Sequence, residues 1–259
     1  MPDEGPKSGA RPVGSVARAL AVLDALAENP DGLGVNELGR RIGVNASTAS
    51  RLLATLESGG LVEREPGAPY RLGLRLVALA DGVLARLDVR ERARPHLHAI
   101  AAETGETATL SVPGGRDAVT VDFVPGGSSV VSLARLGRPS VRHATAVGKV
   151  MLAFGPLAGE PGDELVAFTD RTIVDPAVLE AQLDEVRARG WAEAVGEREP
   201  DLNALAVPVL GRGGALVAIL GLQGPAARLD TARRRAVLPP LRDAASALSR
   251  AVGGTGDGR

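Results

Sequence analysis

Short polar side chains and one arginine lie close together early in the chain, a combination suited to hydrogen bonding with DNA. Short hydroxyl side chains at the start of a helix can reach phosphates and base edges without steric conflict. Arg51 can pair with a guanine through two hydrogen bonds or hold a phosphate. The side chains that we expect to contact DNA are Arg18, Arg40, Arg41, Asn45, Ser47, Thr48, Ser50, Arg51 and Arg64.

Lys149, Glu197 and His143 form a second group of side chains that could do chemistry. Enzymatic catalysis would require a nucleophile held against a base, with a third group orienting that base, and the sequence shows no such set. The simpler interpretation is that Lys149 and Glu197 orient the loops around a pocket and that His143 caps a strand end. We therefore expect no catalytic residues.

The first polar group must be positioned by helices, and three helical patterns surround it. The first begins at Ser15, a good N-cap residue, and is stopped by the Asn-Pro-Asp-Gly sequence at residues 29–32. The second covers residues 36–42, and Gly43 then allows a left-handed turn at little cost. Asn45 can cap the third helix, which ends at Gly59-Gly60. Its apolar face consists of Ala49, Leu52, Leu53 and Leu56.

Two short strand-like stretches, residues 61–64 and 70–72, follow the third helix and flank a Pro-Gly-Ala-Pro tip. Three helices followed by a hairpin predict a winged helix-turn-helix, which lays its third helix in the major groove of DNA. Two helices and a glycine turn occur in many small helical proteins. The prediction therefore rests on the complete series.

The charge of this segment runs against the DNA-binding interpretation. A nucleic-acid-binding domain usually carries an excess of basic residues. Residues 1–75 contain as many acidic as basic residues, and the whole chain has a formal net charge of −1. A weak electrostatic field gives one copy only modest affinity for DNA, so tight binding requires a dimer or a dimer of dimers.

The composition of the chain excludes several other classes. Without cysteine there are no disulfides, no thiolate metal sites and no cysteine nucleophile, which fits a cytoplasmic protein. Three histidines argue against a histidine-rich metal site. No stretch resembles a signal peptide or a membrane span. The glycines form no dinucleotide or phosphate loop and no nucleophile elbow. We expect no cofactor, no metal and no membrane partner.

The 259-residue length suits two domains. Residues 1–14 lack periodicity and are expected to form a disordered tail, and residues 15–73 form the winged helix-turn-helix. Residues 74–87 give an amphipathic helix that is either a linker and dimer seam or an ordinary core helix, two interpretations of equal weight. Residues 88–253 form the second domain, and residues 254–259 a short tail.

The second domain alternates between strand and helix patterns. We expect helices ending at Thr104, starting near Ala146, over 162–168, from Pro176 to Gly190 and over 230–251, and strands at 108–112, 119–123, 130–133, 191–195, 204–210 and 216–222. Strands grouped between helices predict an α+β module rather than a doubly wound nucleotide-binding fold.

Several of these motifs, in this order, resemble the IclR family of bacterial transcriptional regulators. The first half carries SVARALAVLDAL, GLGVNELGRRIGV and STASRLLATLESGGLVER, and the second half carries ETGETATLSV, RLGRPSVRHATAVGKVMLAF, RTIVDPAVLEAQLDEVRARGWA and GPAARL. The resemblance covers residues 13–253. It implies a winged helix-turn-helix, a linker helix, and an effector-binding domain with a curved antiparallel sheet flanked by helices. It also implies homodimers or dimers of dimers on palindromic operators, with small metabolites, often organic or aromatic acids, as effectors.

The resemblance further implies an effector pocket around the helix start in HATAVGK, whose free N–H groups can bind a carboxylate. The residues it assigns to this pocket are Ala146, Val147, Gly148, Asp201, Leu202, Ala204, Gly221 and Gln223. Val147 stands where similar sequences often have a smaller residue and should narrow the pocket. Asp201 stands where they often have glycine, and it should disfavour a nearby anion unless it is paired.

These observations favour a ligand-responsive repressor of a metabolic operon, with double-stranded operator DNA, a small effector and a second copy of itself as partners. One alternative is a metabolite-binding protein whose helix-turn-helix has lost operator function. A less favoured alternative is a small hydrolase that uses Glu197 and Lys149. Binding to a short palindromic duplex separates the first hypothesis from the other two.

Overall fold

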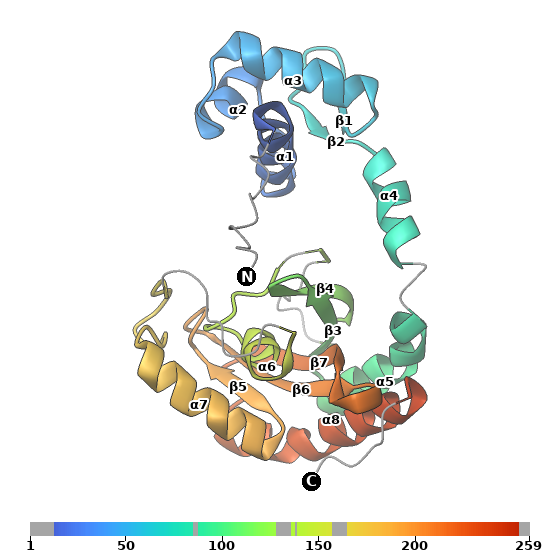
Figure 1. The fold of residues 1–259 in the computed structure, drawn as a ribbon, viewed down its shortest axis with the longest axis vertical. Helices are drawn as coiled ribbons and strands as arrows, with labels where there is room; N and C mark the ends of the chain where they lie inside the picture. Colours follow the sequence, from blue (N-terminus) through green and yellow to red (C-terminus); the bar gives the residue numbers. More distant parts are fainter. Residues whose placement is uncertain (1–12, 85–87, 128–135, 138, 157–164, 254–259) are drawn as a thin grey trace, which may run out of the picture. The chain divides into compact units, whose positions relative to one another are not determined.

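The computed structural model describes residues 13–84, 88–127, 136–137, 139–156 and 165–253. The chain divides into two compact units, residues 1–86 and residues 87–259 (Figure 1).

The first unit is a winged helix-turn-helix. It consists of α1 (Gly14–Ala27), α2 (Val35–Arg41), α3 (Ala46–Ser58), the antiparallel hairpin of β1 (Val62–Glu63) and β2 (Arg71–Leu72), and α4 (Arg75–Leu84). Its core is built from apolar side chains of α1, α2, α3 and the hairpin, namely Val22, Leu26, Leu33, Leu38, Leu53, Leu56, Val62 and Tyr70. Leu33 also forms an isolated bridge with Tyr70, which ties the segment before α2 to the wing.

Local sequence signals set most boundaries of this unit. The Asn45 side chain caps α3 by accepting a hydrogen bond of 2.8 Å from the backbone N–H of Thr48, as predicted. Gly43 has a φ of +68°, the left-handed conformation expected after α2. The prediction that Ser15 caps α1 is wrong. The helix begins at Gly14, its N-cap is Val13, and no side chain bonds the helix start there.

The second unit contains an antiparallel five-stranded sheet in the order β4-β3-β7-β6-β5 among the described residues. Its strands are β3 (Thr107–Gly114), β4 (Asp117–Val124), β5 (Ala192–Val195), β6 (Leu202–Leu210) and β7 (Leu216–Pro225). Its helices are α5 (Asp88–Thr104), α6 (Ala146–Phe154), α7 (Pro176–Arg189) and α8 (Thr231–Ala251), and a short 3₁₀ turn, η1 (Arg212–Gly214), separates β6 from β7.

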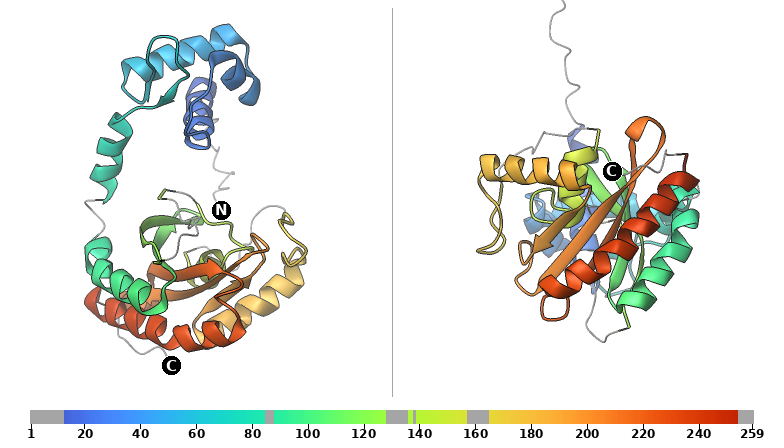
Figure 2. Two further views of the ribbon diagram at one scale, coloured as in Figure 1. Left: turned by 180° about the vertical axis from the view of Figure 1, so that it is seen from behind. Right: turned by 90° about the horizontal axis from the view of Figure 1, so that it is seen from below.

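The helices of this unit cover both faces of the sheet, so it is an α+β fold in three layers. Helices α5 and α8 contact each other and lie on one face, whereas α6 lies on the other face with α7 packed against it (Figure 2). Ala194, Ala206 and Ile219 belong to the apolar cluster around α6 and α7. Because side chains alternate along a strand, their neighbours Glu193, Leu205 and Leu220 lie on the face toward α5 and α8.

Most element boundaries of the second unit lie within a few residues of the predicted ones. Pro176 begins α7 and Gly190 ends it with a φ of +76°, and Asp230 caps α8 at the N–H of Arg233. The helix predicted over 162–168 is wrong in its described part, because residues 165–168 contain no helix. The strand predicted over 130–133 lies outside the described residues.

Among the described residues, no helix is long and apolar enough to cross a membrane. The same part of the chain contains no group of three or more His, Cys, Asp or Glu side chains placed to hold a metal ion.

Candidate nucleic-acid interface and effector pocket

Helix α3 has one buried and one polar face. Ala49, Leu53 and Leu56 are buried in the first unit, whereas Ser47, Ser50 and Arg51 are exposed and Thr48 is half-buried. Among the described residues, the Arg51 guanidinium makes no hydrogen bond or ion pair with another side chain. The face that the sequence assigned to DNA therefore presents hydroxyl groups and one unpaired cation, the donor types that read base edges and hold phosphates.

Arg40 and Arg41, at the end of α2, share one acidic partner. The Glu37 carboxylate accepts hydrogen bonds from both guanidinium groups, and its bond to the Nε of Arg41 measures 2.9 Å. These hydrogen bonds, that of Arg41 first, hold the pKa of Glu37 below its usual range. The three side chains together keep one net positive charge beside the turn that leads into α3.

Of the two remaining DNA-contact candidates, Arg18 is exposed on α1. The Arg64 guanidinium lies 4.6 Å from the centre of the Tyr70 ring, and its Nε is 4.0 Å from a carboxylate oxygen of Glu57. Sequence reasoning missed Arg75, which donates a 2.6 Å hydrogen bond to the carbonyl of Gly59 at the end of α3. A cation at that position stabilises the negative end of the helix dipole.

A cavity of about 110 Å³ lies at the start of α6, above the sheet of the second unit. It is lined by Thr109, Thr120, Pro139, Ser140, Val141, Ala144, Thr145, Ala146, Val147, Ala194, Arg198, Glu199, Leu202, Ala204 and Gln223. The lining combines an apolar wall, several hydroxyl groups, and one basic and one acidic side chain. Ligand pockets in proteins usually have this mixture of apolar surface and a few polar groups.

Strand register builds the floor of this cavity. Gln223 pairs with Ala204 across β7 and β6, and Ala204 pairs with Ala194 of the edge strand β5. On β3, Thr109 pairs with Gly221. A Cβ atom on Gly221 would lie 2.4 Å from the Oγ1 of Thr109 and 3.3 Å from a methyl group of Val147. Glycine at position 221 therefore leaves room for both of these cavity-lining side chains.

The start of α6 supplies hydrogen-bond donors to the cavity. Thr145 caps the helix, and its Oγ1 accepts the N–H of Gly148 at 3.0 Å. A Cβ on Gly148 would lie 2.4 Å from the carbonyl oxygen of Val141, so only glycine allows this close approach. Within the described chain, the backbone N–H groups of Ala146 and Val147 have no hydrogen-bond partner. Both residues line the cavity, so two donors are available for an oxygen atom.

The structure brings together most of the effector residues that the resemblance implied. Ala146, Val147, Leu202, Ala204 and Gln223 line the cavity. Gly221 lies beneath it, and the Gly148 N–H is used by the cap. Asp201 is exposed and does not line the cavity. The acidic side chain on the lining is that of Glu199.

Sequence reasoning missed Thr109, Thr120, Ser140, Val141, Arg198 and Glu199. One signal could have found the first of these. In β3, Thr107, Thr109 and Ser111 alternate with apolar residues, yet all three are buried. Buried hydroxyl groups on one face of a strand indicate that something polar is packed there. Thr120 lies on β4, and the other missed residues come from loops, whose positions depend on tertiary packing.

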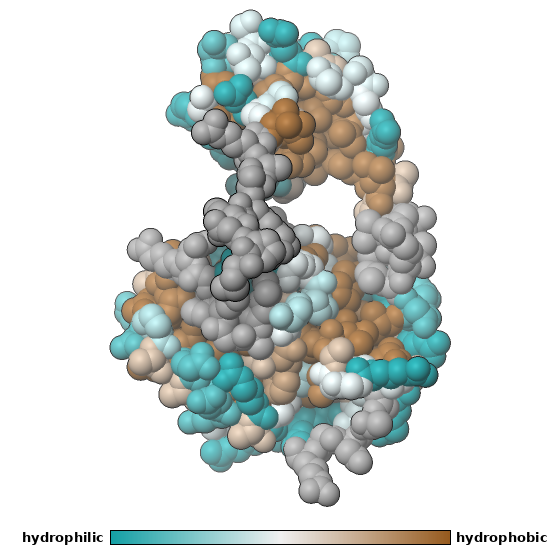
Figure 3. Space-filling view, viewed as in Figure 1, coloured by the Kyte–Doolittle hydropathy of each residue, from teal (hydrophilic) through white to brown (hydrophobic). Residues whose placement is uncertain are grey.

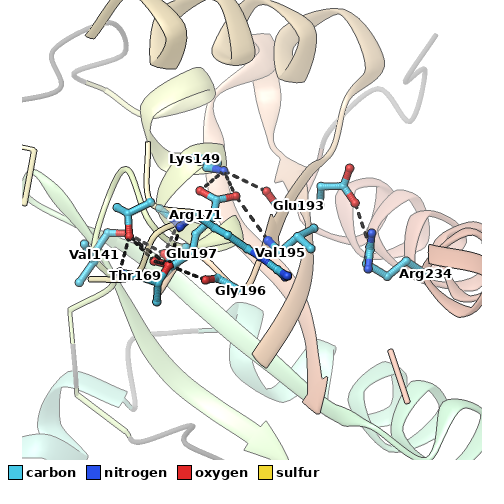
Figure 4. Close-up of polar contacts among 12 residues, drawn as sticks. Val141, Lys149, Thr169, Arg171, Glu193, Val195, Gly196, Glu197 and Arg234 are labelled. Carbon is cyan, nitrogen blue, oxygen red and sulfur yellow. Dashed lines mark hydrogen bonds and ion pairs between the residues drawn. The ribbon is translucent and has the colours of Figure 1, made fainter. Parts of the chain in front are cut away.

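Lys149 and Glu197 form a buried ion pair next to the cavity (Figure 4). The Lys149 ammonium lies 2.6 and 2.7 Å from the two carboxylate oxygens of Glu197 and 3.2 Å from the carbonyl oxygen of Glu193. Burial lowers the pKa of Lys149 below its ordinary value, and the Glu197 carboxylate opposes that shift. The pair joins α6 to the segment that follows β5.

The segment after β5 is also held by hydroxyl groups. Thr172 donates a 2.6 Å hydrogen bond to the carbonyl of Glu197, and Thr169 donates one of 2.7 Å to the carbonyl of Gly196. The next residue, Arg198, places its guanidinium 4.0 Å from the centre of the Phe168 ring. These contacts fix Arg198 and Glu199 on the cavity wall, in agreement with the interpretation that Lys149 and Glu197 orient a pocket loop.

His143 is buried close to the same segment. Its Nε2 lies 2.9 Å from the carbonyl oxygen of Val166, and its ring centre is 5.9 Å from that of Phe168. Val166 lies outside any described strand, so the prediction that His143 caps a strand end is wrong. His143 instead anchors the chain that covers this end of α6.

Hydrophobic side chains are exposed on the first unit, and Figure 3 shows them on the surface around α4. Val13, Val16 and Leu20 follow one face of α1, and all are more than half exposed. Leu74 and Val77, three residues apart, are similarly exposed on one side of the start of α4, and Leu79 is exposed on another side. We call Val13, Val16 and Leu20 the α1 stripe, and Leu74 with Val77 the α4 stripe. Apolar stripes of this kind on a folded domain usually mark contacts with another surface.

Comparison with known proteins identifies the same two parts of the chain. Residues 15–66 match the family model described as the IclR helix-turn-helix domain. Residues 81–250 match the model described as the bacterial transcriptional regulator IclR C-terminal domain.

Individual proteins are similar over nearly the whole chain. The HTH-type transcriptional regulator XynR of Escherichia coli is 32% identical, over 92% of this chain and 97% of its own length. The glycerol operon regulatory protein of Streptomyces griseus is 34% identical, over 94% and 98%. An IclR homologue from Microbacterium hydrocarbonoxydans, solved in complex with 4-hydroxybenzoate, is 26% identical with a TM-score of 0.77, over 92% and 98%.

Proposed function

This chain belongs to the IclR family of bacterial transcriptional regulators, and we propose that it represses a metabolic operon under the control of a small ligand bound at the start of α6. The unpaired N–H groups of Ala146 and Val147 beside the 110 Å³ cavity carry this proposal. Its relatives are named as regulators, a non-enzymatic role, which sets the hydrolase alternative aside.

For DNA recognition, we assign base contacts to the exposed face of α3. Arg51, Ser47 and Ser50 project from this face and would reach base edges in the major groove. The surrounding cations, Arg18, Arg40, Arg41 and Arg64, would hold phosphates. Asn45 and Thr48 fix the start of α3 through the cap, which leaves the Asn45 amide N–H groups for a phosphate oxygen.

For the ligand, we propose a small oxygen-rich metabolite, either a polyhydroxy compound or a hydroxy acid. The hydroxyl groups of Thr109, Thr120 and Ser140 line the cavity, and hydroxyl groups can both donate and accept hydrogen bonds. Arg198 and Glu199 leave the lining without net formal charge. A neutral compound therefore fits the cavity, as does an acid whose single carboxylate binds Arg198 or the start of α6. The Streptomyces griseus relative is named for a glycerol operon, and the Microbacterium homologue holds a hydroxylated acid.

For assembly, we propose a homodimer joined through the first unit. The α1 stripe and the α4 stripe offer apolar surface that a second copy would cover. Residues 1–75 carry no net charge, so one copy alone would bind DNA weakly. Two linked copies on a palindromic operator gain affinity because the second contact becomes intramolecular. Since operators are chromosomal, this function places the protein in the cytoplasm.

Footprinting of the full-length protein on the DNA upstream of its own gene tests the proposed function. The expected result is protection of a palindrome, weakened when glycerol-sized polyols or short hydroxy acids are added. Protection that never responds to any member of such a panel would contradict the ligand assignment. Absence of protection at upstream DNA, with specific binding of a ligand retained, would instead support the alternative of a metabolite-binding protein without operator function.

A further inference from the structure

A second cavity lies on the opposite face of the sheet from α6. It encloses about 290 Å³ between the start of α8 and the strand β5 with the turn before it. Its lining residues are Arg189, Trp191, Glu193, Thr231, Arg234, Arg235 and Leu238. None of them lines the cavity at the start of α6.

Guanidinium groups dominate this second cavity. Arg189, Arg234 and Arg235 face a single acidic side chain, that of Glu193, so the formal charge of the lining is positive. Among the described residues, Arg235 has no partner, and Arg189 bonds only a backbone oxygen, that of Trp191, at 2.9 Å. Two cations therefore converge on the cavity without a carboxylate of their own.

The third cation, Arg234, is built into the wall. Its side chain is nearly buried, with a residue exposure of 8%. Its Nε donates to the Glu193 carboxylate at 3.0 Å, and its two Nη atoms donate to the Leu229 carbonyl and the Thr231 hydroxyl. Figure 4 shows the bond between Arg234 and the Glu193 carboxylate. Because a guanidinium has five N–H donors and these bonds use three, Arg234 retains donors for a further acceptor.

Trp191 forms the flat side of the cavity. The Arg189 guanidinium lies over its ring, 3.8 Å from the ring centre. Stacking of this kind fixes the plane of a guanidinium and so presets the direction of its remaining N–H groups.

We propose that this cavity binds a small oxyanion, a molecule carrying a phosphate or a carboxylate group, as a second ligand distinct from the effector. Guanidinium groups bond such anions through pairs of parallel hydrogen bonds, and the fork of Arg189, Arg234 and Arg235 supplies them. The volume of about 290 Å³ matches a small molecule, since ligand pockets range upward from roughly 300 Å³. A polyanion such as DNA would need a positively charged surface much more extended than this pocket.

The strand β5 connects the two cavities. Ala194 lines the first cavity and its neighbour Glu193 lines the second, because adjacent residues of a strand point to opposite faces. The carbonyl of Glu193 also accepts a hydrogen bond from Lys149, which holds the loop of the effector cavity. An anion that displaces the Glu193 carboxylate from Arg234 therefore removes a contact of β5, the strand that supports the effector cavity.

Trp191 is the only tryptophan of the chain, so its fluorescence reports on this cavity in the full-length protein. We would titrate the protein with inorganic phosphate and, separately, with acetate and citrate, each against sodium chloride at equal ionic strength. The expected result is a saturable change in Trp191 emission with at least one of these anions and none with chloride. Which anion acts identifies the phosphate or the carboxylate as the recognised group.

Three variants sharpen this test. Arg235→Gln should lower the affinity for the anion by roughly tenfold or more, since it removes a charge-assisted hydrogen bond. Glu193→Gln should raise the affinity, because it removes the only acidic side chain of the lining that competes for Arg234. Arg250→Gln, at the exposed far end of α8, is the matched control and should leave the titration unchanged. Circular dichroism confirms that each variant is folded.

The proposal fails if the anions and chloride change Trp191 emission alike, or not at all. It fails equally if Arg235→Gln and Arg250→Gln behave in the same way, or if Trp191 responds to duplex DNA but to no small anion. None of these results depends on whether the protein recognises an operator, so the outcome is independent of the proposed regulatory function.

Discussion

Lys149 is a fully buried charged residue, and its partners indicate a structural role. Its side chain has 0% exposure, and its ammonium group is surrounded by the carboxylate of Glu197 and the carbonyl of Glu193. Burying an ammonium ion costs several kcal/mol unless a partner compensates, so the pair adds little net stability. Its value lies in fixing α6 against the loop that carries Arg198 and Glu199.

Breaking this ion pair from one side should therefore cost more than removing it. We expect Glu197→Gln to destabilise the second unit by about 3–5 kcal/mol, because an unpaired ammonium is left buried. The double variant Lys149→Met with Glu197→Leu should recover a large part of that loss. Denaturant unfolding of the three proteins measures both effects. Equal stability of Glu197→Gln and the unsubstituted protein would show that water already reaches the pair.

Val147 limits the space in the proposed effector cavity, because it lines the cavity and lies close to Gly221. We expect Val147→Phe to fill the cavity, so that operator binding persists while the response to the ligand disappears. Val147→Ala is the matched control, which should keep the response and accept slightly larger ligands. Footprinting with and without the effector measures this. A Val147→Phe protein with an unchanged ligand midpoint would place the effector elsewhere.

At the scale of elements, the sequence predicted those parts of the fold that depend on local signals. Asn45 acts through a side-chain bond to its own helix, and Gly43, Pro176 and Gly190 act through their own backbone geometry. The sequence predicts each of these four positions. The helix predicted over 162–168 is absent from its described part, residues 165–168. A short apolar run has no decisive period, so its sequence does not distinguish a helix from other conformations. Its conformation is fixed by tertiary contacts, from His143 to the Val166 carbonyl and from the Phe168 N–H to the hydroxyl of Thr172.

The candidate sites divide in the same way. The polar face of α3 follows from helical periodicity within one segment, so residues such as Arg51 could be found from spacing alone. The proposed effector cavity assembles side chains from β3, β4, α6, β5, β6, β7 and loops between them. Arg198 and Glu199 are held on its wall by long-range contacts such as the Lys149–Glu197 pair, and no local pattern in the sequence reveals those contacts.

Helix α3 should depend measurably on its cap. We expect Asn45→Ala to lower the free energy of opening of α3 by about 1 kcal/mol, since the side chain satisfies the Thr48 N–H. Hydrogen exchange of the full-length protein, followed over residues 46–58, measures this change. Ser47→Ala, which removes an exposed hydroxyl that bonds no backbone N–H of α3, should leave exchange unchanged. Equal exchange in both variants would show that the cap is not formed in solution.

For the whole molecule, the DNA-binding unit matters in two ways: it carries no net charge, and it exposes apolar side chains on α1 and beside α4. The α1 stripe includes Val16 and Leu20, which are 56% and 57% exposed. Neutrality weakens the binding of one copy to DNA, and the apolar stripes favour association of two copies. Both features are explained together if the protein functions as a dimer.

Charges placed in the α1 stripe should disrupt this dimer. We expect the unsubstituted protein to be a dimer or a tetramer at micromolar concentration, and Val16→Glu with Leu20→Glu to shift it to a smaller species. Val178→Glu is the matched control, because Val178 is 53% exposed but lies on α7 in the second unit. Light scattering gives the masses. A monomeric unsubstituted protein, or a double variant of unchanged mass, would contradict assembly through the first unit.

If the exposed face of α3 recognises an operator, the loss of the Arg51 side chain must weaken the binding of the upstream duplex. Fluorescence anisotropy would compare this variant with Arg250→Ala, an exposed arginine of the second unit, at fixed salt. We predict that Arg51→Ala loses about 1–3 kcal/mol of binding free energy per half-site, doubled in a dimer, while its fold and the control stay unchanged. Unchanged affinity of Arg51→Ala for the operator would contradict the account.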